Sequence, residues 1–294
     1  MYLDFFNLKE FPFNQCSSTD YYYGFENHQD SMDVLLVGLQ VNDGIIKITG
    51  DTGTGKSLLC RIFIEKIYKD FYPVYLSNPY ITDFELLQAI AAELQISQND
   101  VHQKNTLSKL IHDKALELQK ENKKLVLIFD EAQCLSVENL EVIRILSNLE
   151  HNNSKLCQII LIGGLELDDK LKSLNHFLQR ISFSCKLRPI KQKDLNNYLF
   201  HRLTMASKPG KNHGITITPK ASKLLYKKTR GIPRLINIVF HKALMLAYSR
   251  GENDITKKII SKAIEDTEVI NGKSALQKLY ILLIKLTMRS ARSM

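Results

Sequence analysis

Cysteine is scarce in this 294-residue chain, and its five copies are scattered. No two of them form a C-x-x-C pair. This argues against a disulfide framework and against a zinc site, and it fits a reducing compartment. The five are Cys16, Cys60, Cys134, Cys157 and Cys185.

The opening residues lack the basic region and the following apolar run of a secretory signal, so we expect a cytoplasmic protein. Internal repeats and long low-complexity stretches are also absent. Hydrophobic residues make up 44% of the chain and charged residues 24%, which is ordinary for a soluble globular protein. A chain of this length can bury one large core or two smaller ones.

Positive charge is scarce in the first part of the chain and abundant in the second. Residues 1–185 hold 17 Lys and Arg against 25 Asp and Glu, a net charge of −8. Residues 186–294 hold 23 against 6, a net charge of +17. Two interpretations stay open. The basic part either binds an anionic partner, such as nucleic acid, acidic lipid or an acidic protein face, or is a solvated surface whose lysines serve solubility.

Short apolar runs alternate with helical stretches through the first part. Nearly continuous apolar runs indicate parallel strands that are covered on both faces. The alternation therefore predicts a doubly wound α/β domain with ligands at the carboxyl ends of its strands. The expected strands are 45–49, 74–77, 125–129, 158–162 and 181–185, and the expected helices are 57–69, 83–94, 106–121 and 137–150, with Ser136 as an N-cap of the last.

After residue 189 the strand pattern stops, and we expect a small all-α domain. Thr218 and Pro219 form a cap followed by a first-turn proline, and Gly231 separates two helices. The expected helices are 192–206, 219–229, 233–250 and 256–270.

Residues 50–57 read Gly-Asp-Thr-Gly-Thr-Gly-Lys-Ser, a full match to the phosphate-binding pattern G-x-x-x-x-G-K-[ST]. The pattern lies between an expected strand and an expected helix, which argues against a chance glycine-rich turn. We expect its three glycines to take positive φ and turn backbone amides toward an anion. We expect Lys56 to reach the β- and γ-phosphates of ATP and Ser57 to bind Mg²⁺. The predicted nucleotide-binding residues are Gly50, Asp51, Thr52, Gly53, Thr54, Gly55, Lys56, Ser57 and Leu58.

The apolar run 125–129 delivers two adjacent acids, Asp130 and Glu131, at its carboxyl end. Such a pair often marks a plain strand end, but about 70 residues after a phosphate loop it indicates a magnesium site. We expect Asp130 to hold Mg²⁺ and Glu131 to orient and deprotonate the attacking water. Phosphoryl transfer also needs positive charge at the γ-phosphate, for which Arg180 and Arg234 are candidates. From the residues alone, an arginine in either position is more often a surface residue or the partner of an acid.

Taken together, these motifs resemble the AAA+ ATPases of the general secretion pathway protein A (ExeA) group. That group includes the MshM-type proteins of mannose-sensitive haemagglutinin (MSHA, type IV) pilus assembly. The resemblance covers roughly residues 1–270. It rests on Met1-Tyr2 with Phe5-Phe6, Leu8 and Pro12-Phe13, on 50–57, on 129–133 (FDEAQ), on 146–150, on 179–181, on 231–237 (GIPRLIN) and on 243–248.

The resemblance implies a P-loop AAA+ domain followed by a small helical lid, and an oligomeric, Mg²⁺-dependent ATPase. It implies that Arg180 is an arginine finger acting on a neighbouring subunit and that Arg234 senses the γ-phosphate. It also implies that the N-terminal aromatics, including Phe13 and Tyr22-Tyr23, line the adenine side, although core packing is equally compatible with any one of them. The expected domains are an N-terminal segment packed on the ATPase domain (1–40), the ATPase core (41–190), the lid (191–271) and a basic amphipathic tail (272–294).

Two departures from the family pattern matter. The family has Gly-Gln-Pro-Glu-Leu after its fourth strand, where this chain has Gly163-Gly164-Leu165-Glu166-Leu167. Gly164 replaces a polar residue that helps to position water, so hydrolysis is slow or a neighbour substitutes. Secretion-type members also continue into a transmembrane helix and a peptidoglycan-binding domain. The end of this chain at Met294 therefore favours the shorter, pilus-type members.

The tail carries a short apolar run, 279–284, between two lysines. The run is far below the roughly 20 residues needed to span a bilayer. The tail either lies on the inner-membrane surface or on a partner, or packs on its own domain.

The leading hypothesis is thus a cytoplasmic AAA+ ATPase that self-associates and supports pilus or secretion assembly proteins. A DNA-binding ATPase of the transposition type and a slow nucleotide switch are the alternatives.

Overall fold

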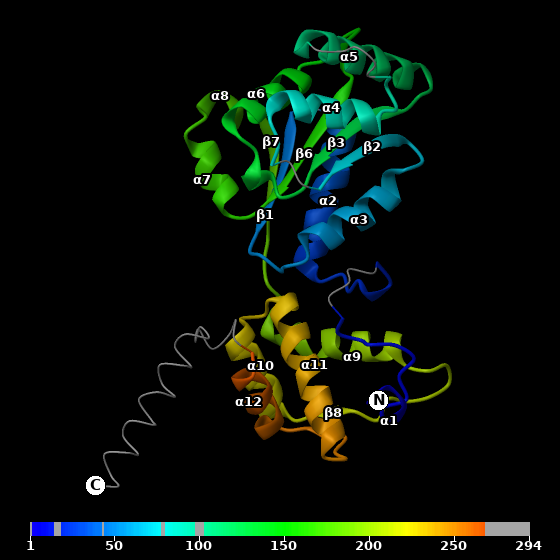
Figure 1. The fold of residues 1–294 in the computed structure, drawn as a ribbon, viewed down its shortest axis with the longest axis vertical. Helices are drawn as coiled ribbons and strands as arrows, with labels where there is room; N and C mark the ends of the chain where they lie inside the picture. The colour runs from blue at the N-terminus through cyan, green and yellow to red at the C-terminus, as the bar shows by residue number, and fades with distance from the viewer. Residues whose placement is uncertain (1, 15–18, 43, 78–79, 98–102, 268–294) are drawn as a thin grey trace, which may run out of the picture. The chain divides into compact units, whose positions relative to one another are not determined.

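The computed structural model describes residues 2–14, 19–42, 44–77, 80–97 and 103–267. The chain divides into two compact units: an α/β unit, residues 17–188, and a helical unit formed by residues 1–16 and 189–294 (Figure 1). The expected tail, 272–294, lies outside the described residues. Among the helices that are described, none has the length and apolar character required to cross a bilayer.

The α/β unit is built on a five-stranded sheet in the order β2-β3-β6-β1-β7, with every neighbouring pair parallel. This confirms the predicted parallel α/β fold. Each expected strand is present, with bounds that differ by up to three residues. The strands are β1 (Ile45–Gly50), β2 (Phe71–Leu76), β3 (Lys124–Phe129), β6 (Cys157–Gly163) and β7 (Ile181–Leu187).

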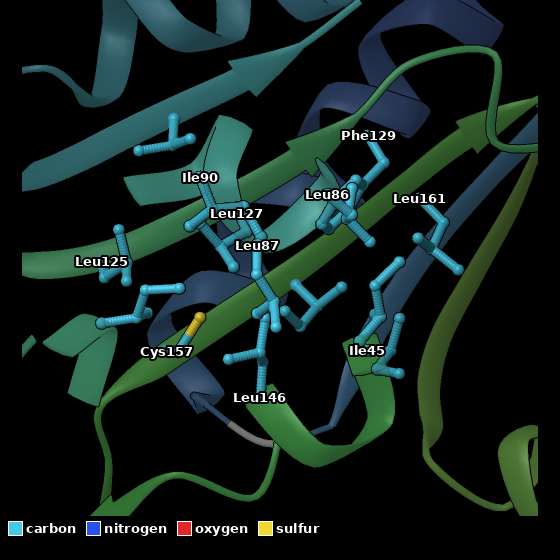
Figure 2. Close-up of a cluster of buried hydrophobic side chains, with 14 of the residues drawn as sticks. Ile45, Leu86, Leu87, Ile90, Leu125, Leu127, Phe129, Leu146, Cys157 and Leu161 are labelled. Atoms are coloured by element: carbon cyan, nitrogen blue, oxygen red, sulfur yellow. The ribbon is translucent and has the colours of Figure 1, made fainter. Parts of the chain in front are cut away.

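Alternate residues of the central strands face opposite sides of the sheet, which explains their nearly continuous apolar runs. Leu125, Leu127 and Phe129 of β3 point into one buried cluster, which includes Leu86 and Leu87 of α4 (Asp83–Glu93) (Figure 2). Val126 and Ile128 point into a second cluster on the opposite face. The first cluster takes residues from α4, α5 (Lys104–Lys120), α6 (Val137–Leu146), α7 (Glu166–Lys172) and α8 (Asn175–Leu178). The second takes residues from α2 (Glu26–Val41) and α3 (Lys56–Ile67).

Several elements of the α/β unit were not predicted. Helix α2 buries His28, Ser31 and Gly38 beside its apolar residues, so its apolar periodicity is weak. The others are too short to give a periodic pattern: η1 (Thr19–Tyr21), η2 (Ala132–Cys134), the hairpin of β4 (Glu150–His151) and β5 (Ser154–Lys155), α7 (Glu166–Lys172) and α8 (Asn175–Leu178). The expected cap of α6 is confirmed, because the Ser136 side chain accepts a hydrogen bond from the Asn139 amide.

The helical unit contains the expected helices, although the last, expected to reach 270, ends at Glu265. It also contains a pair of two-residue parallel strands that the all-α expectation missed. Strands this short leave no alternating pattern in the sequence. Thr218 caps α10 as predicted, with Pro219 in the first turn. The elements are α1 (Tyr2–Phe5), η3 (Gln192–Asp194), α9 (Leu195–Ala206), β8 (Thr216–Ile217), α10 (Pro219–Thr229), α11 (Pro233–Ser249), β9 (Asp254–Ile255) and α12 (Lys257–Glu265).

The expected N-terminal segment, 1–40, is wrong as a single piece. Residues 1–16 belong to the helical unit, and only the remainder belongs to the α/β unit. The Tyr2 hydroxyl hydrogen-bonds Nδ1 of His241, at 3.0 Å, and the Phe13 ring packs edge-on against Phe240, with centroids 4.9 Å apart. Both contacts are to the apolar helix α11, which buries the aromatic start of the chain. The boundary between the units falls at 188/189, close to the expected 190/191.

Candidate nucleotide-binding site

The loop between β1 and α3 has the conformation that a phosphate-binding turn requires. Gly53 and Gly55 have φ of +86° and +100°, as predicted. Gly50 does not, and the expectation of positive φ there is wrong. Its requirement for glycine is spatial, because a Cβ at this position would lie 2.6 Å from the Leu187 carbonyl oxygen. The loop is therefore shaped by two left-handed residues and one close backbone approach.

Lys56 begins α3 and turns its ammonium back into the loop. Nζ donates to the carbonyl oxygens of Gly50, at 2.9 Å, and Asp51, at 3.1 Å, and the residue is only 7% exposed. Burial lowers the pKa of Lys56, and the negative charges of Glu131 and Asp130 oppose that shift. The lysine therefore lies within the electrostatic reach of the acid pair, as the motif predicts.

The remaining loop residues divide into a buried and an accessible set. Thr54 is buried, and its hydroxyl donates to the Asp51 carbonyl, at 2.8 Å. Asp51 and Thr52 are exposed at the turn, whereas Ser57 and Leu58 are half-buried in the first turn of α3. Ser57, the expected Mg²⁺ ligand, is therefore partly accessible to solvent.

His28 of α2 contacts the backbone of the loop, and sequence reasoning missed this contact. Its Nε2 lies 3.1 Å from the Thr54 carbonyl oxygen, and because a carbonyl only accepts, Nε2 carries the proton. Tyr22 stacks on its ring and Phe25 meets the ring edge-on. The residue is 5% exposed, and burial lowers its pKa to about 4. His28 is therefore neutral, and nothing in its sequence neighbourhood indicates this contact.

Asp130 lies at the carboxyl end of β3, buried and fixed at both oxygens. Oδ2 accepts from the Tyr75 hydroxyl, at 2.8 Å, and Oδ1 accepts from the Glu131 amide, at 2.9 Å. Burial and the neighbouring carboxylate raise the pKa of Tyr75, which keeps its proton available for donation. Glu131 is exposed and has a left-handed backbone, with φ of +52°. Asp130 is thus buried and held by two hydrogen bonds, whereas Glu131 lies at the surface.

Arg180 lies at the amino end of the strands, whereas the loop lies at their carboxyl end. Its carbonyl accepts from the amide of Ile45, the first residue of β1, whereas the loop follows Gly50, the last residue. Six residues of parallel strand separate the two by about 17 Å. Arg180 is exposed and lines a polar hollow of about 250 Å³ with Lys155 and Ser182. The structure does not bring Arg180 to its own loop.

Arg234 is exposed in the first turn of α11, three residues after the left-handed Gly231. It belongs to the helical unit, whereas the loop and the acid pair belong to the α/β unit. Of the expected adenine-side aromatics, Phe13 is buried in the helical unit beneath the Arg202 guanidinium. For Phe13 the structure therefore supports core packing, while Tyr22 remains beside the loop through its contact with His28.

Residues 39–171 match the family model described as an AAA domain. The match covers less than half of the chain and assigns these residues, not the whole chain, to the AAA domain family. It is also 34% identical over 281 residues to general secretion pathway protein A of Aeromonas hydrophila, a match that covers 94% of this chain and 50% of the relative. The resemblance inferred from the motifs is therefore confirmed. The chain spans half the length of that curated relative.

Solved structures share the fold. The Aeropyrum pernix ORC2 protein, solved in ADPNP–ADP complexes, superposes with a TM-score of 0.64 at 15% identity, over 88% of this chain and 72% of its own. The Thermotoga maritima RuvB Holliday junction branch migration motor gives a TM-score of 0.54 at 14% identity, over 86% and 72%. At these identities the likeness extends to the fold, a P-loop parallel sheet followed by helices.

Proposed function

We propose that this chain is a Mg²⁺-dependent ATPase. The observation that supports this most is the position of Lys56, whose ammonium is enclosed by the loop and lies in the field of Asp130 and Glu131. A lysine in a glycine turn beside an acid pair is the combination that binds a triphosphate with its magnesium.

The donor set fits a metal–nucleotide complex. Ser57 and Asp130 supply the oxygen ligands that Mg²⁺ prefers, and the ion would neutralise charge on the phosphates. Tyr75 holds the Asp130 carboxylate in place, so that little ordering is needed on binding. The exposed carboxylate of Glu131 is the group that orients water and takes its proton.

We further propose that Arg180 completes the site of a neighbouring copy and that Arg234 senses the γ-phosphate from the helical unit. Arg180 lies at the amino end of the strands and the loop lies at their carboxyl end, so Arg180 cannot contact a phosphate bound to the loop of its own chain. This position supports a role in trans. The site is then complete only in an oligomer, as ring or filament.

The relation to general secretion pathway protein A supports a role in assembling a type IV (MSHA-type) pilus or a general secretion machine. On this proposal the protein works in the cytoplasm with pilus or secretion assembly proteins. The segment 272–294 would contact the inner-membrane surface.

The test is ATP binding and turnover by three variants. Lys56→Ala should weaken ATP binding about a hundredfold, because a buried charged donor is lost. Glu131→Gln should lower turnover about a hundredfold or more while leaving ATP affinity intact. Lys66→Ala, at an exposed lysine on the same helix, is the matched control. Unchanged binding by Lys56→Ala would refute the phosphate-loop assignment.

A DNA-binding ATPase is the second candidate, favoured by the charge of the helical unit. Lys220, Lys223 and Lys227 are exposed and spaced along one face of α10, and α12 begins with two exposed lysines. Duplex DNA that binds tightly at low salt, loses affinity steeply as salt rises and stimulates ATPase would favour this reading. A third candidate, a slow nucleotide switch, is favoured by Gly164 and would show tight ATP binding with negligible turnover.

A further inference from the structure

The side chain of Gln133 bridges Glu131 and the end of β6. Its Nε2 donates to Oε2 of Glu131, at 2.5 Å, and its Oε1 accepts from the backbone amide of Gly164, at 2.7 Å. A carboxylate needs a donor and an amide needs an acceptor, so the carboxamide has only one orientation that satisfies both. Both ends of the Gln133 side chain are therefore committed to the candidate site.

The peptide that carries Gln133 is itself anchored. Lys170 of α7 donates to the Gln133 carbonyl, at 2.5 Å, and to the Leu135 carbonyl, at 2.7 Å. Gln133 lies in the short η2 turn (Ala132–Cys134), directly after the acid pair. Because Lys170 of α7 holds the Gln133 backbone, the Gln133 side chain can hold the Glu131 carboxylate in one orientation.

The two glycines at the end of β6 make room for this side chain. A Cβ at Gly163 would lie 2.8 Å from Oε1 of Gln133, closer than a Cβ contact allows. A Cβ at Gly164 would lie 3.6 Å from Cδ of Gln133, and its severe contact, at 2.1 Å, is with the tip of the exposed Glu166 side chain. The carboxamide of Gln133 thus fills the space beside Gly163 and Gly164.

We infer that Gln133 is a positioning residue for Glu131. It holds one oxygen of Glu131 and ties that carboxylate to the end of β6, so that the other oxygen faces the attacking water. The inference rests on the proposed ATPase function. It names the residue that orients the carboxylate of the proposed general base.

The experiment measures kcat and ATP affinity for three variants. Gln133→Ala should lower kcat about tenfold to a hundredfold with ATP affinity unchanged, because only the alignment of Glu131 is lost. Gln133→Glu keeps the length of the side chain but replaces its donor with an acceptor, and should lose as much. Gln40→Ala, at an exposed glutamine of the same unit, should behave as wild type.

An unchanged kcat in Gln133→Ala overturns the inference, as does an ATP affinity that falls in parallel with kcat. These outcomes are distinct from failure of the proposed function, in which the wild-type protein itself neither binds nor hydrolyses ATP. Thermal unfolding of each variant shows that the fold is intact.

Discussion

Acid should weaken the α/β unit through His28 more than through any exposed histidine. The folded-state pKa of His28 is about 4, against 6.5 for an ordinary histidine, because burial disfavours the charged ring. Between these two values the unfolded chain binds a proton that the folded chain does not. The stability that neutral His28 contributes is therefore present above about pH 6.5 and is lost as the pH falls toward 4.

The size of the effect follows from that gap. A difference of this size between folded and unfolded pKa corresponds to about 3 kcal/mol in total, of which about 2 kcal/mol is lost by pH 5. Nε2 of His28 donates to the Thr54 carbonyl, so the variant must keep a donor at that distance. His28→Gln keeps a donor and has no group that titrates in this range.

The assay is urea unfolding of the α/β unit, followed by circular dichroism at about pH 7.5 and about pH 5. His28→Gln should show a fall in unfolding free energy between the two pH values that is about 2 kcal/mol smaller than in wild type. His151→Gln, at an exposed histidine of β4, is the matched control and should keep the wild-type pH dependence. A His28→Gln protein with the wild-type pH dependence would refute the reasoning.

Two further predictions concern the helical unit and the oligomer. Gly231→Ala should destabilise the protein by about 2 kcal/mol or more, because the residue has φ of +74° and its Cβ would lie 2.2 Å from the Ile190 carbonyl oxygen. Gly210→Ala, with φ of +71° and open space around its Cβ, should cost only about 1 kcal/mol in the same denaturation assay, and equal losses would contradict the steric argument. Arg180→Ala and Glu131→Gln proteins, each impaired alone, should regain ATPase activity when mixed. The absence of any regain in a mixing titration would exclude a role for Arg180 in trans.

The sequence predicts best where the phosphate loop and the acid pair lie in the α/β unit. The phosphate loop and the acid pair are short motifs whose geometry follows from a strand that ends at Gly50 and another that ends at Phe129. Even there, the pattern says that position 50 needs glycine but not why, and the reason proved to be the nearby Leu187 carbonyl rather than positive φ.

Contacts between distant segments were the part that sequence reasoning could not reach. The aromatic start of the chain needs a buried partner, but no pattern in residues 1–16 indicates that the partner is α11. In the same way, His28 beneath Thr54 and Tyr75 against Asp130 depend on how elements pack. The hydrogen bonds of Gln133 to Glu131 and to the Gly164 amide likewise depend on how η2 packs against the end of β6.

The central claim is that the loop after β1 and the acid pair after β3 bind one magnesium–triphosphate group. An experimental structure of the protein with a non-hydrolysable ATP analogue and Mg²⁺ tests this most directly. The account predicts the triphosphate on the amides of residues 53–57, with the ion between the Ser57 hydroxyl and the Asp130 carboxylate. A nucleotide bound elsewhere, or an ion with no link to Asp130, would contradict it.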